Sequence, residues 1–156
     1  MEEKLKYIEN EISALGMQIT SDQAEKLLVY YGLLVEWNEK MNLTAITDFE
    51  AVVKKHFVDS LSIIYVKNMD DVDNLIDIGT GAGFPGIPLK IMFPHLKVTL
   101  LDSLRKRIDF LNHVVERLDL CELETVHGRA EDFAKPGVKR EKYDLCVSRA
   151  VADLAV

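Results

Sequence analysis

The sequence predicts an α/β fold in which a parallel β-sheet follows an all-helical N-terminal region. Residues 1–70 carry hydrophobic residues at helical spacing, whereas from Asn74 onward short hydrophobic strands alternate with helical segments. A glycine-rich turn joins the first strand to the next helix. Strands that alternate with helices form a parallel sheet through right-handed crossovers. We therefore expect a helical region over 1–70 and a sheet domain over 71–156.

Three helices are predicted in the N-terminal region. The first covers residues 3–15. Thr20 and Gln23 have the spacing of a capping box and start the second helix. Thr47 and Glu50 repeat that spacing, and we expect them to start the third.

Four strands and two helices are predicted in the sheet domain. The strands cover 75–78, 98–101, 123–126 and 143–147. A short helix after the glycine turn runs to about Met92, and hydrophobic residues line one face of a longer helix between Leu104 and Leu118. Within the fourth strand, Leu145-Cys-Val147 is continuously hydrophobic, which is typical of a strand buried on both faces.

Composition is that of an ordinary globular protein. Hydrophobic residues make up 48% and charged residues 29% of the chain. No hydrophobic run reaches the roughly 18 residues that a membrane span needs. The N-terminus is acidic where a secretory signal would be basic. We therefore expect a cytoplasmic protein that does not bind a membrane.

The net charge of −7 argues against a nucleic-acid partner at first sight. The acidic excess, however, lies in the N-terminal helices: residues 1–50 carry a net charge of −6, and residues 51–156 are close to neutral. Arg105, Lys106 and Arg107 form a basic cluster at the start of a predicted helix. The charge pattern therefore leaves RNA open as a partner.

The sequence predicts no metal site. Cys121 and Cys146 lie among hydrophobic neighbours and follow no metal-binding or redox spacing. His95, His113 and His127 also lack the spacing of metal ligands.

A glycine loop and an acidic residue are expected to meet at one edge of the sheet. Gly79, Gly81 and Gly83 follow the first strand, where the absence of side chains lets the backbone approach a ligand. Asp102 ends the second strand, 23 residues after Gly79. A carboxylate in this position can accept hydrogen bonds from both hydroxyls of an adenosine ribose. The sequence therefore predicts an adenosine-containing cofactor.

Two cofactor classes fit this loop. The segment Gly81–Gly86 spells GxGxxG, the pattern of nicotinamide dinucleotide enzymes. Three features favour S-adenosylmethionine: the glycines begin earlier, at Gly79; Pro85 removes an early helix N–H that would hold a pyrophosphate; and Ala130-Glu131-Asp132 follows the third strand, where methyltransferases contact adenine. None of the three is decisive. Two alternatives stay open. One is a fragment of a nicotinamide-dependent oxidoreductase, although the chain is too short to hold the second mononucleotide half of such an enzyme. The other is a non-catalytic module that binds adenosine.

Several longer motifs extend beyond the glycine loop. In chain order they are Trp37-Asn38, Asn42-Leu-Thr-Ala-Ile46, His56-Phe-Val-Asp-Ser-Leu61, Asp77-Ile-Gly-Thr-Gly-Ala-Gly-Phe-Pro-Gly-Ile-Pro-Leu89, Leu100-Leu-Asp-Ser103 with Lys106-Arg107, and Val147-Ser-Arg-Ala150. Over about residues 20–153 this set closely resembles the bacterial RsmG (GidB) family of 16S ribosomal RNA guanine-N7 methyltransferases. The resemblance implies a Rossmann-like sheet of class I S-adenosylmethionine-dependent methyltransferases, S-adenosylmethionine as cofactor, and 16S ribosomal RNA or the small ribosomal subunit as partner.

The resemblance also implies which residues bind the cofactor. By match to the family pattern these are Gly79, Phe84, Ala130, Glu131 and Arg149, to which the loop and ribose arguments add Gly81, Gly83 and Asp102. No catalytic acid or base is predicted, because guanine N7 carries a free lone pair at neutral pH. Catalysis is then mainly in-line positioning of N7 against the methyl group. Consistent with this, Val147-Ser-Arg differs from the Asn/Asp-Pro-Pro-aromatic motif of methyltransferases that act on exocyclic amines.

Residues outside the cofactor site have simpler expected roles. His56, beside Lys54 and Lys55, is expected on a solvated helix face rather than at RNA phosphate. The basic cluster at 105–107 is better placed to contact RNA. Trp37 and Phe49 are expected to pack between helices.

The chain is expected to lack C-terminal parts of the enzyme. Members of the resembled family continue well past Val156, and Asp153-Leu-Ala-Val has the character of a helix start. We expect residual cofactor binding at best from these 156 residues, and no methylation of ribosomal RNA.

Overall fold

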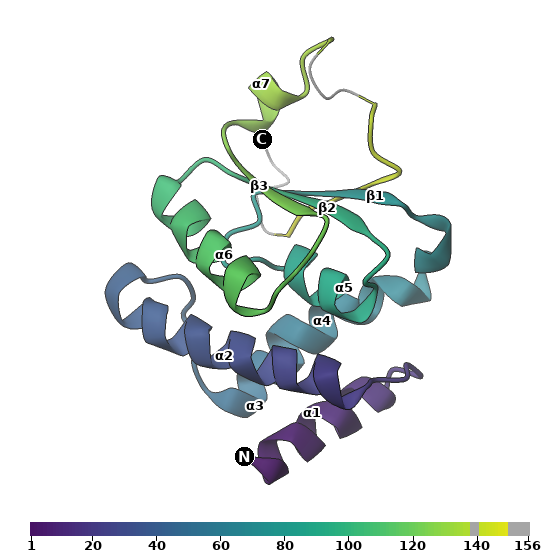
Figure 1. The fold of residues 1–156 in the computed structure, drawn as a ribbon, viewed down its shortest axis with the longest axis vertical. Helices are drawn as coiled ribbons and strands as arrows, with labels where there is room; N and C mark the ends of the chain where they lie inside the picture. Colours follow the sequence, from purple (N-terminus) through teal and green to yellow (C-terminus); the bar gives the residue numbers. More distant parts are fainter. Residues whose placement is uncertain (138–140, 150–156) are drawn as a thin grey trace, which may run out of the picture.

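A computed structural model describes residues 1–137 and 141–149. Its centre is a parallel sheet with the strand order β3-β2-β1-β4 (Figure 1). The strands are β1 (Asn74–Ile78), β2 (Lys97–Asp102), β3 (Leu123–His127) and β4 (Leu145–Val147). The predicted parallel sheet is confirmed, and its first strand pairs with the fourth, although β4 begins two residues later than expected. The helix start expected at Asp153 lies outside the described residues.

The N-terminal region is helical, as predicted. It comprises α1 (Glu2–Ser13), α2 (Ser21–Met41), α3 (Phe49–Val52), the π-helix η1 (Val53–Val58), α4 (Asp59–Leu61) and the 3₁₀ turns η2 (Ser62–Tyr65) and η3 (Met69–Asp71). The capping box of α2 is present, because Thr20 and Gln23 exchange backbone-to-side-chain hydrogen bonds of 2.9 and 3.2 Å. No helix in the described part of the chain is long and apolar enough to cross a membrane.

The predicted cap of the third helix is wrong by one residue. Asp48, not Thr47, is the N-cap, and its carboxylate accepts a hydrogen bond of 3.0 Å from the Ala51 amide. The Thr47 carbonyl instead accepts from the Tyr31 hydroxyl. Threonine and aspartate are both good N-caps. The contact between Tyr31 and Thr47 holds the loop so that the helix begins one residue later than expected.

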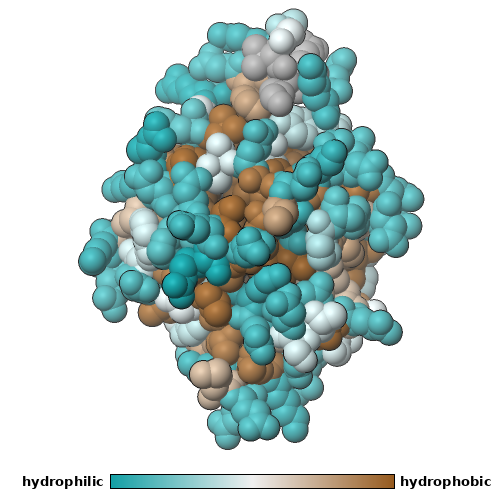
Figure 2. All heavy atoms as spheres, in the orientation of Figure 1, coloured by the Kyte–Doolittle hydropathy of each residue, from teal (hydrophilic) through white to brown (hydrophobic). Residues whose placement is uncertain are grey.

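Most of the helices cover one face of the sheet. In Figure 1, α5 (Gly86–Met92), α6 (Arg105–Arg117) and the N-terminal helices lie on one side, and α7 (Ala130–Phe133) lies on the other. One hydrophobic core runs from α1 through α2 and α5 to β1 and β2. In Figure 2 hydrophobic side chains form a band down the middle of this view, between polar residues at the rim. Trp37 and Phe49 pack against the core, as expected.

Candidate functional site

A cavity of about 580 Å³ opens at the carboxyl ends of β1, β2 and β3. Its lining residues are Ile78, Gly79, Leu101, Asp102, Ser103, Arg107, Gly128, Arg129, Ala130 and Glu131. Gly79, Asp102, Ala130 and Glu131, half of the predicted cofactor residues, therefore meet around one space. Another cavity, of about 470 Å³, is lined by residues from the opposite ends of the strands and by none of the predicted ones.

The glycine loop folds back over the end of β2. The amides of Gly79 and Thr80 donate to the Leu101 carbonyl at 2.8 and 3.1 Å, and the Gly83 amide donates to the Thr80 carbonyl at 3.0 Å. Gly79, Gly81 and Gly83 have φ values of 65°, 60° and 101°, a region that side chains rarely enter. The loop is thus held in a shape that favours glycine at these three positions.

The glycines at the far end of the loop serve packing. A Cβ atom at Gly83 would lie 2.6 Å from both Ile87 Cδ1 and the Tyr30 hydroxyl. One at Gly86 would lie 2.4 Å from Leu100 Cδ2. A Cβ at Gly81, in contrast, would meet nothing within 4 Å. Of the predicted residues, Gly83 is therefore enclosed by protein, and Gly81 faces open space.

Asp102 connects the glycine loop to the start of α6. Its Oδ2 accepts from the Gly81 amide at 2.9 Å, and its Oδ1 accepts from the Leu104 amide at 3.0 Å. The Arg107 guanidinium lies 3.5 Å from Oδ2. The side chain is only 2% exposed yet borders the cavity. The structure thus adds a structural role for Asp102 to the predicted ribose contact.

Asp77 is a buried acid that the sequence analysis noted only as part of a motif. Its Oδ2 accepts from the Thr80 hydroxyl at 2.7 Å and the Gly86 amide at 2.8 Å. Its Oδ1 has no hydrogen-bond partner among the described residues. Burial raises the pKa of Asp77 to about 7, despite the lowering effect of these two hydrogen bonds. An aspartate inside a hydrophobic strand, just before the glycines, was the signal that could have marked it.

Phe84 and Arg149 lie outside this cavity, in an aromatic and cationic cluster. The Phe84 side chain is 4% exposed, and its ring lies 5.3 Å from that of Tyr30. The Arg149 guanidinium lies over the Phe84 ring, with its central carbon 5.2 Å from the ring centroid. The residue four positions after Phe84 is Pro88, which has no N–H, so the Phe84 carbonyl receives no hydrogen bond from it. Because the ring is buried and this carbonyl is not used in the helix, we expect Phe84 to contact a ligand through its backbone.

The expectation that His56 lies on a solvated helix face is wrong. The π-helix η1 directs its ring inward, so that the side chain is 8% exposed and stacks on Phe84 at a centroid distance of 4.5 Å. Burial, and then the charge of Arg149, lower the pKa of His56 to about 4. Helical spacing could have shown this, because His56 lies four residues after Val52 and three after Val53, and both valines are buried.

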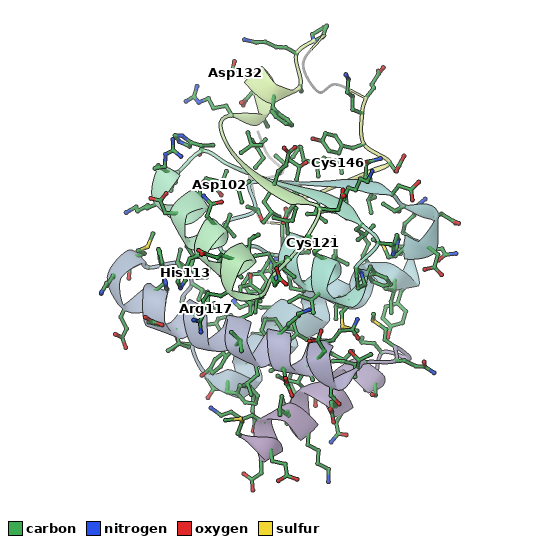
Figure 3. All side chains as sticks on the ribbon, viewed as in Figure 1. Asp102, His113, Arg117, Cys121, Asp132 and Cys146 are labelled. Atoms are coloured by element: carbon green, nitrogen blue, oxygen red, sulfur yellow. The ribbon has the colours of Figure 1, made fainter. Side chains whose placement is uncertain are left out.

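The basic cluster and the cysteines named from the sequence differ in how exposed they are. Arg105 and Lys106 are exposed, whereas Arg107 is half-buried against Asp102. Cys146 is exposed, not enclosed as expected, because nothing in the described part of the chain covers β4 on that side. Burial and Asp77 nevertheless raise the pKa of its thiol. Figure 3 shows Cys146 and Cys121 apart from each other, with Asp102 near the start of α6. No group of three metal-ligating side chains occurs among residues 1–137 and 141–149.

The strand order of the sheet, the glycine loop after β1 and the aspartate at the end of β2 together define a Rossmann-like fold of the class I methyltransferase type. The crystal structure of a putative caffeoyl-CoA O-methyltransferase from Staphylococcus aureus shares this fold, with a TM-score of 0.53 and 19% identity over 74% of this chain and 51% of that chain. The chain belongs to the family described as rRNA small subunit methyltransferase G, which it matches over residues 23–156. The resemblance seen in the sequence is thereby confirmed.

Two relatives show how far this similarity extends. The ribosomal RNA small subunit methyltransferase G of Lachnoclostridium phytofermentans is 55% identical over 144 residues, which are 92% of this chain and 60% of that protein. The protein of the same name from Alkaliphilus metalliredigens is 52% identical over 156 residues, all of this chain and 65% of that protein. The chain thus spans about three-fifths of the length of these relatives.

Proposed function

We propose that this chain forms the cofactor-binding part of an enzyme that transfers a methyl group from S-adenosylmethionine to N7 of a guanine in 16S ribosomal RNA. The observation that carries the proposal is the meeting of Gly79, Asp102, Ala130 and Glu131 around one cavity in a member of this family. A ribosomal substrate would place the enzyme in the cytoplasm.

S-adenosylmethionine fits the residues that are present. A cavity of about 580 Å³ is within the usual range for cofactor sites. Asp102 Oδ1 accepts one hydrogen bond, from Leu104, and so keeps a lone pair for a ribose hydroxyl. Ala130 and Glu131 would border the adenine, and Arg149 would attract the methionine carboxylate. When bound, the cofactor supplies an electrophilic methyl group.

The chemistry of guanine N7 requires little from the protein beyond positioning. N7 has a free lone pair, so no side chain has to remove a proton before transfer. The Cys146 thiol, whose pKa is raised, is a poor base or nucleophile at neutral pH. We therefore assign no catalytic acid or base, in keeping with the interpretation of the sequence.

The start of α5 argues against a nicotinamide dinucleotide. A pyrophosphate would bind to free N–H groups at this helix terminus. The Gly86 amide, however, donates to Asp77, the Ile87 amide donates to the Gly83 carbonyl at 2.8 Å, and Pro88 has no N–H. The first turn therefore has no N–H left for a pyrophosphate. This observation favours S-adenosylmethionine over the dinucleotide alternative.

A thermal-shift panel tests the choice of cofactor. S-adenosylmethionine and S-adenosylhomocysteine are expected to raise the melting temperature of the chain, because a ligand that binds only the folded state stabilises it. NAD is expected to have no effect at the same concentration. An equal shift with NAD, or none with either sulfur compound, would contradict the proposal. Labelled methyl transfer to 30S subunits by a full-length family member that contains this chain would separate an enzyme from a non-catalytic binding module.

RNA binding is expected to involve the exposed basic residues Arg105 and Lys106 near the cavity. Each phosphate contact that they make should steepen the decrease of affinity with salt. Titrations of a 16S RNA fragment at several salt concentrations, with wild type and an Arg105→Ala, Lys106→Ala double variant, measure this slope. A flat salt response, or an unchanged slope in the variant, would count against the assignment.

A further inference from the structure

Arg149 is held at the end of β4 by groups from one short segment. Its Nη2 lies 2.8 Å from His56 Nδ1, and its Nη1 lies 3.1 Å from Asp59 Oδ2 and 3.2 Å from the Lys55 carbonyl. Within the described part of the chain, these partners account for three of the five guanidinium N–H groups. The others remain for a ligand.

The contact with Arg149 determines the state of the His56 ring. A guanidinium only donates hydrogen bonds, so His56 Nδ1 must be unprotonated and accept. The proton of the neutral ring is then on Nε2, which lies 3.0 Å from Thr44 Oγ1 and donates to it. The lowered pKa of His56, caused by burial and by Arg149, agrees with a neutral ring at pH 7. Besides Arg149, Asp59 is the other charged group that acts on it.

Thr44 is itself fixed in place. Its amide donates to Asn38 Oδ1 at 2.8 Å, and its hydroxyl oxygen accepts from the Ile46 amide at 3.1 Å. The loop after α2 therefore holds the far side of the His56 ring, and Phe84 covers one of its faces. Three contacts in different directions leave the ring one orientation.

The backbone under His56 supports the same conclusion. It lies in a π-helix of six residues, a conformation that is rare and is frequently found at functional sites. The His56 carbonyl accepts from the Ser60 hydroxyl as well as from the Asp59 amide. On this turn the His56 ring both stacks on Phe84 and contacts Arg149.

We propose that His56 is a positioning residue, whose neutral ring fixes the Arg149 guanidinium against Phe84 so that it can bind the carboxylate of the cofactor's methionine. Asp59 holds the second nitrogen of the same guanidinium. This inference rests on the proposed function for its ligand. The positioning of Arg149 itself concerns the protein alone and can be measured without a ligand.

Matched variants separate the two sides of the ring. His56→Asn keeps an acceptor near the position of Nδ1, His56→Gln keeps a polar group near Nε2, and His56→Phe keeps only the stacking. We expect S-adenosylhomocysteine affinity to fall by about tenfold in H56Q and H56F, the scale of one hydrogen bond to a charged group, and by less in H56N. His113→Asn is the control, because His113 lies on α6 (Figure 3) and packs on Trp37 of α2 instead of on Arg149. Equal losses in H56N and H56F, or none in either, would overturn the inference.

Nitrogen NMR tests the inference without any ligand. In the wild type at pH 7 we expect a neutral His56 ring with its proton on Nε2, and slowed rotation of the Arg149 guanidinium that is lost in H56F. A charged ring, or a proton on Nδ1, would overturn the inference even if every variant fails to fold. If these signals are as expected but neither sulfur compound binds, the proposed function fails and the positioning of Arg149 stands.

Discussion

The two ends of the glycine loop differ in what surrounds them. At one end, Gly79 borders an open cavity and Gly81 faces open space. At the other, Gly83 and Phe84 are enclosed by Tyr30, Ile87 and other side chains. The same motif thus forms a surface that can receive a ligand and a packed support behind it. Residues that look equivalent in the sequence therefore divide into binding and supporting roles.

The largest effect is expected from alanine substitutions at these two ends. Gly83→Ala introduces a Cβ 2.6 Å from two neighbours at a φ of 101°, so the free energy of unfolding should fall by about 3 kcal/mol. Gly81→Ala adds only the cost of a positive φ, about 1 kcal/mol. Urea unfolding of both variants measures the difference. Equal losses would show that the two ends are packed alike.

A smaller effect is expected at Asp102, on the open side of the loop, where Gly79 borders the cavity and Gly81 faces open space. Asp102→Ala should weaken S-adenosylmethionine binding by about 1.5–3 kcal/mol, the scale of a hydrogen bond to a charged group. Asp102→Asn keeps one acceptor oxygen and should lose less. Calorimetry on variants shown to be folded measures both. Wild-type affinity in Asp102→Ala would remove this carboxylate from the binding site.

The smallest net effect concerns the pH dependence of stability, because two buried groups behind the glycine loop, His56 and Asp77, act in opposite directions. The pKa of His56 is lowered to about 4, so the unfolded chain takes up the proton first and stability is lost as the pH falls from about 6.5 to 4. Asp77 acts in the opposite sense: its pKa is raised to about 7, so the folded state binds the proton first and gains stability as the pH falls from 7 toward 4.

Unfolding at pH 7 and pH 5 distinguishes the two groups. H56N should lose less stability on acidification than the wild type, and Asp77→Asn should lose more. Identical pH dependence in all three proteins would mean that neither group has the environment described above.

The sheet could be predicted well from the sequence, because the patterns that indicate its elements are local in the chain. Hydrophobic strands and the capping box of α2 involve residues close together in the chain, so the pattern of each element indicates its structure. The cavity was predictable too, since Gly79, Asp102 and Ala130 all follow strand ends, which a parallel sheet brings to one edge.

The support behind the loop was not predictable in the same way. His56 and Arg149 are 93 residues apart in the chain and meet only in the folded structure. The packing role of Gly83 likewise depends on Tyr30, a residue of α2. Both are long-range contacts, for which helical spacing and motif matches give no signal.

Backbone amide NMR with added S-adenosylhomocysteine tests most directly the claim that the open side receives the cofactor. We expect the largest chemical-shift changes at Gly79, Gly81, Asp102, Ala130 and Glu131, around the cavity at the carboxyl ends of β1, β2 and β3. Smaller changes are expected at Gly83, which is enclosed. Saturable binding whose changes are confined to the opposite ends of the strands, near Asn74 and Glu122, would contradict the account.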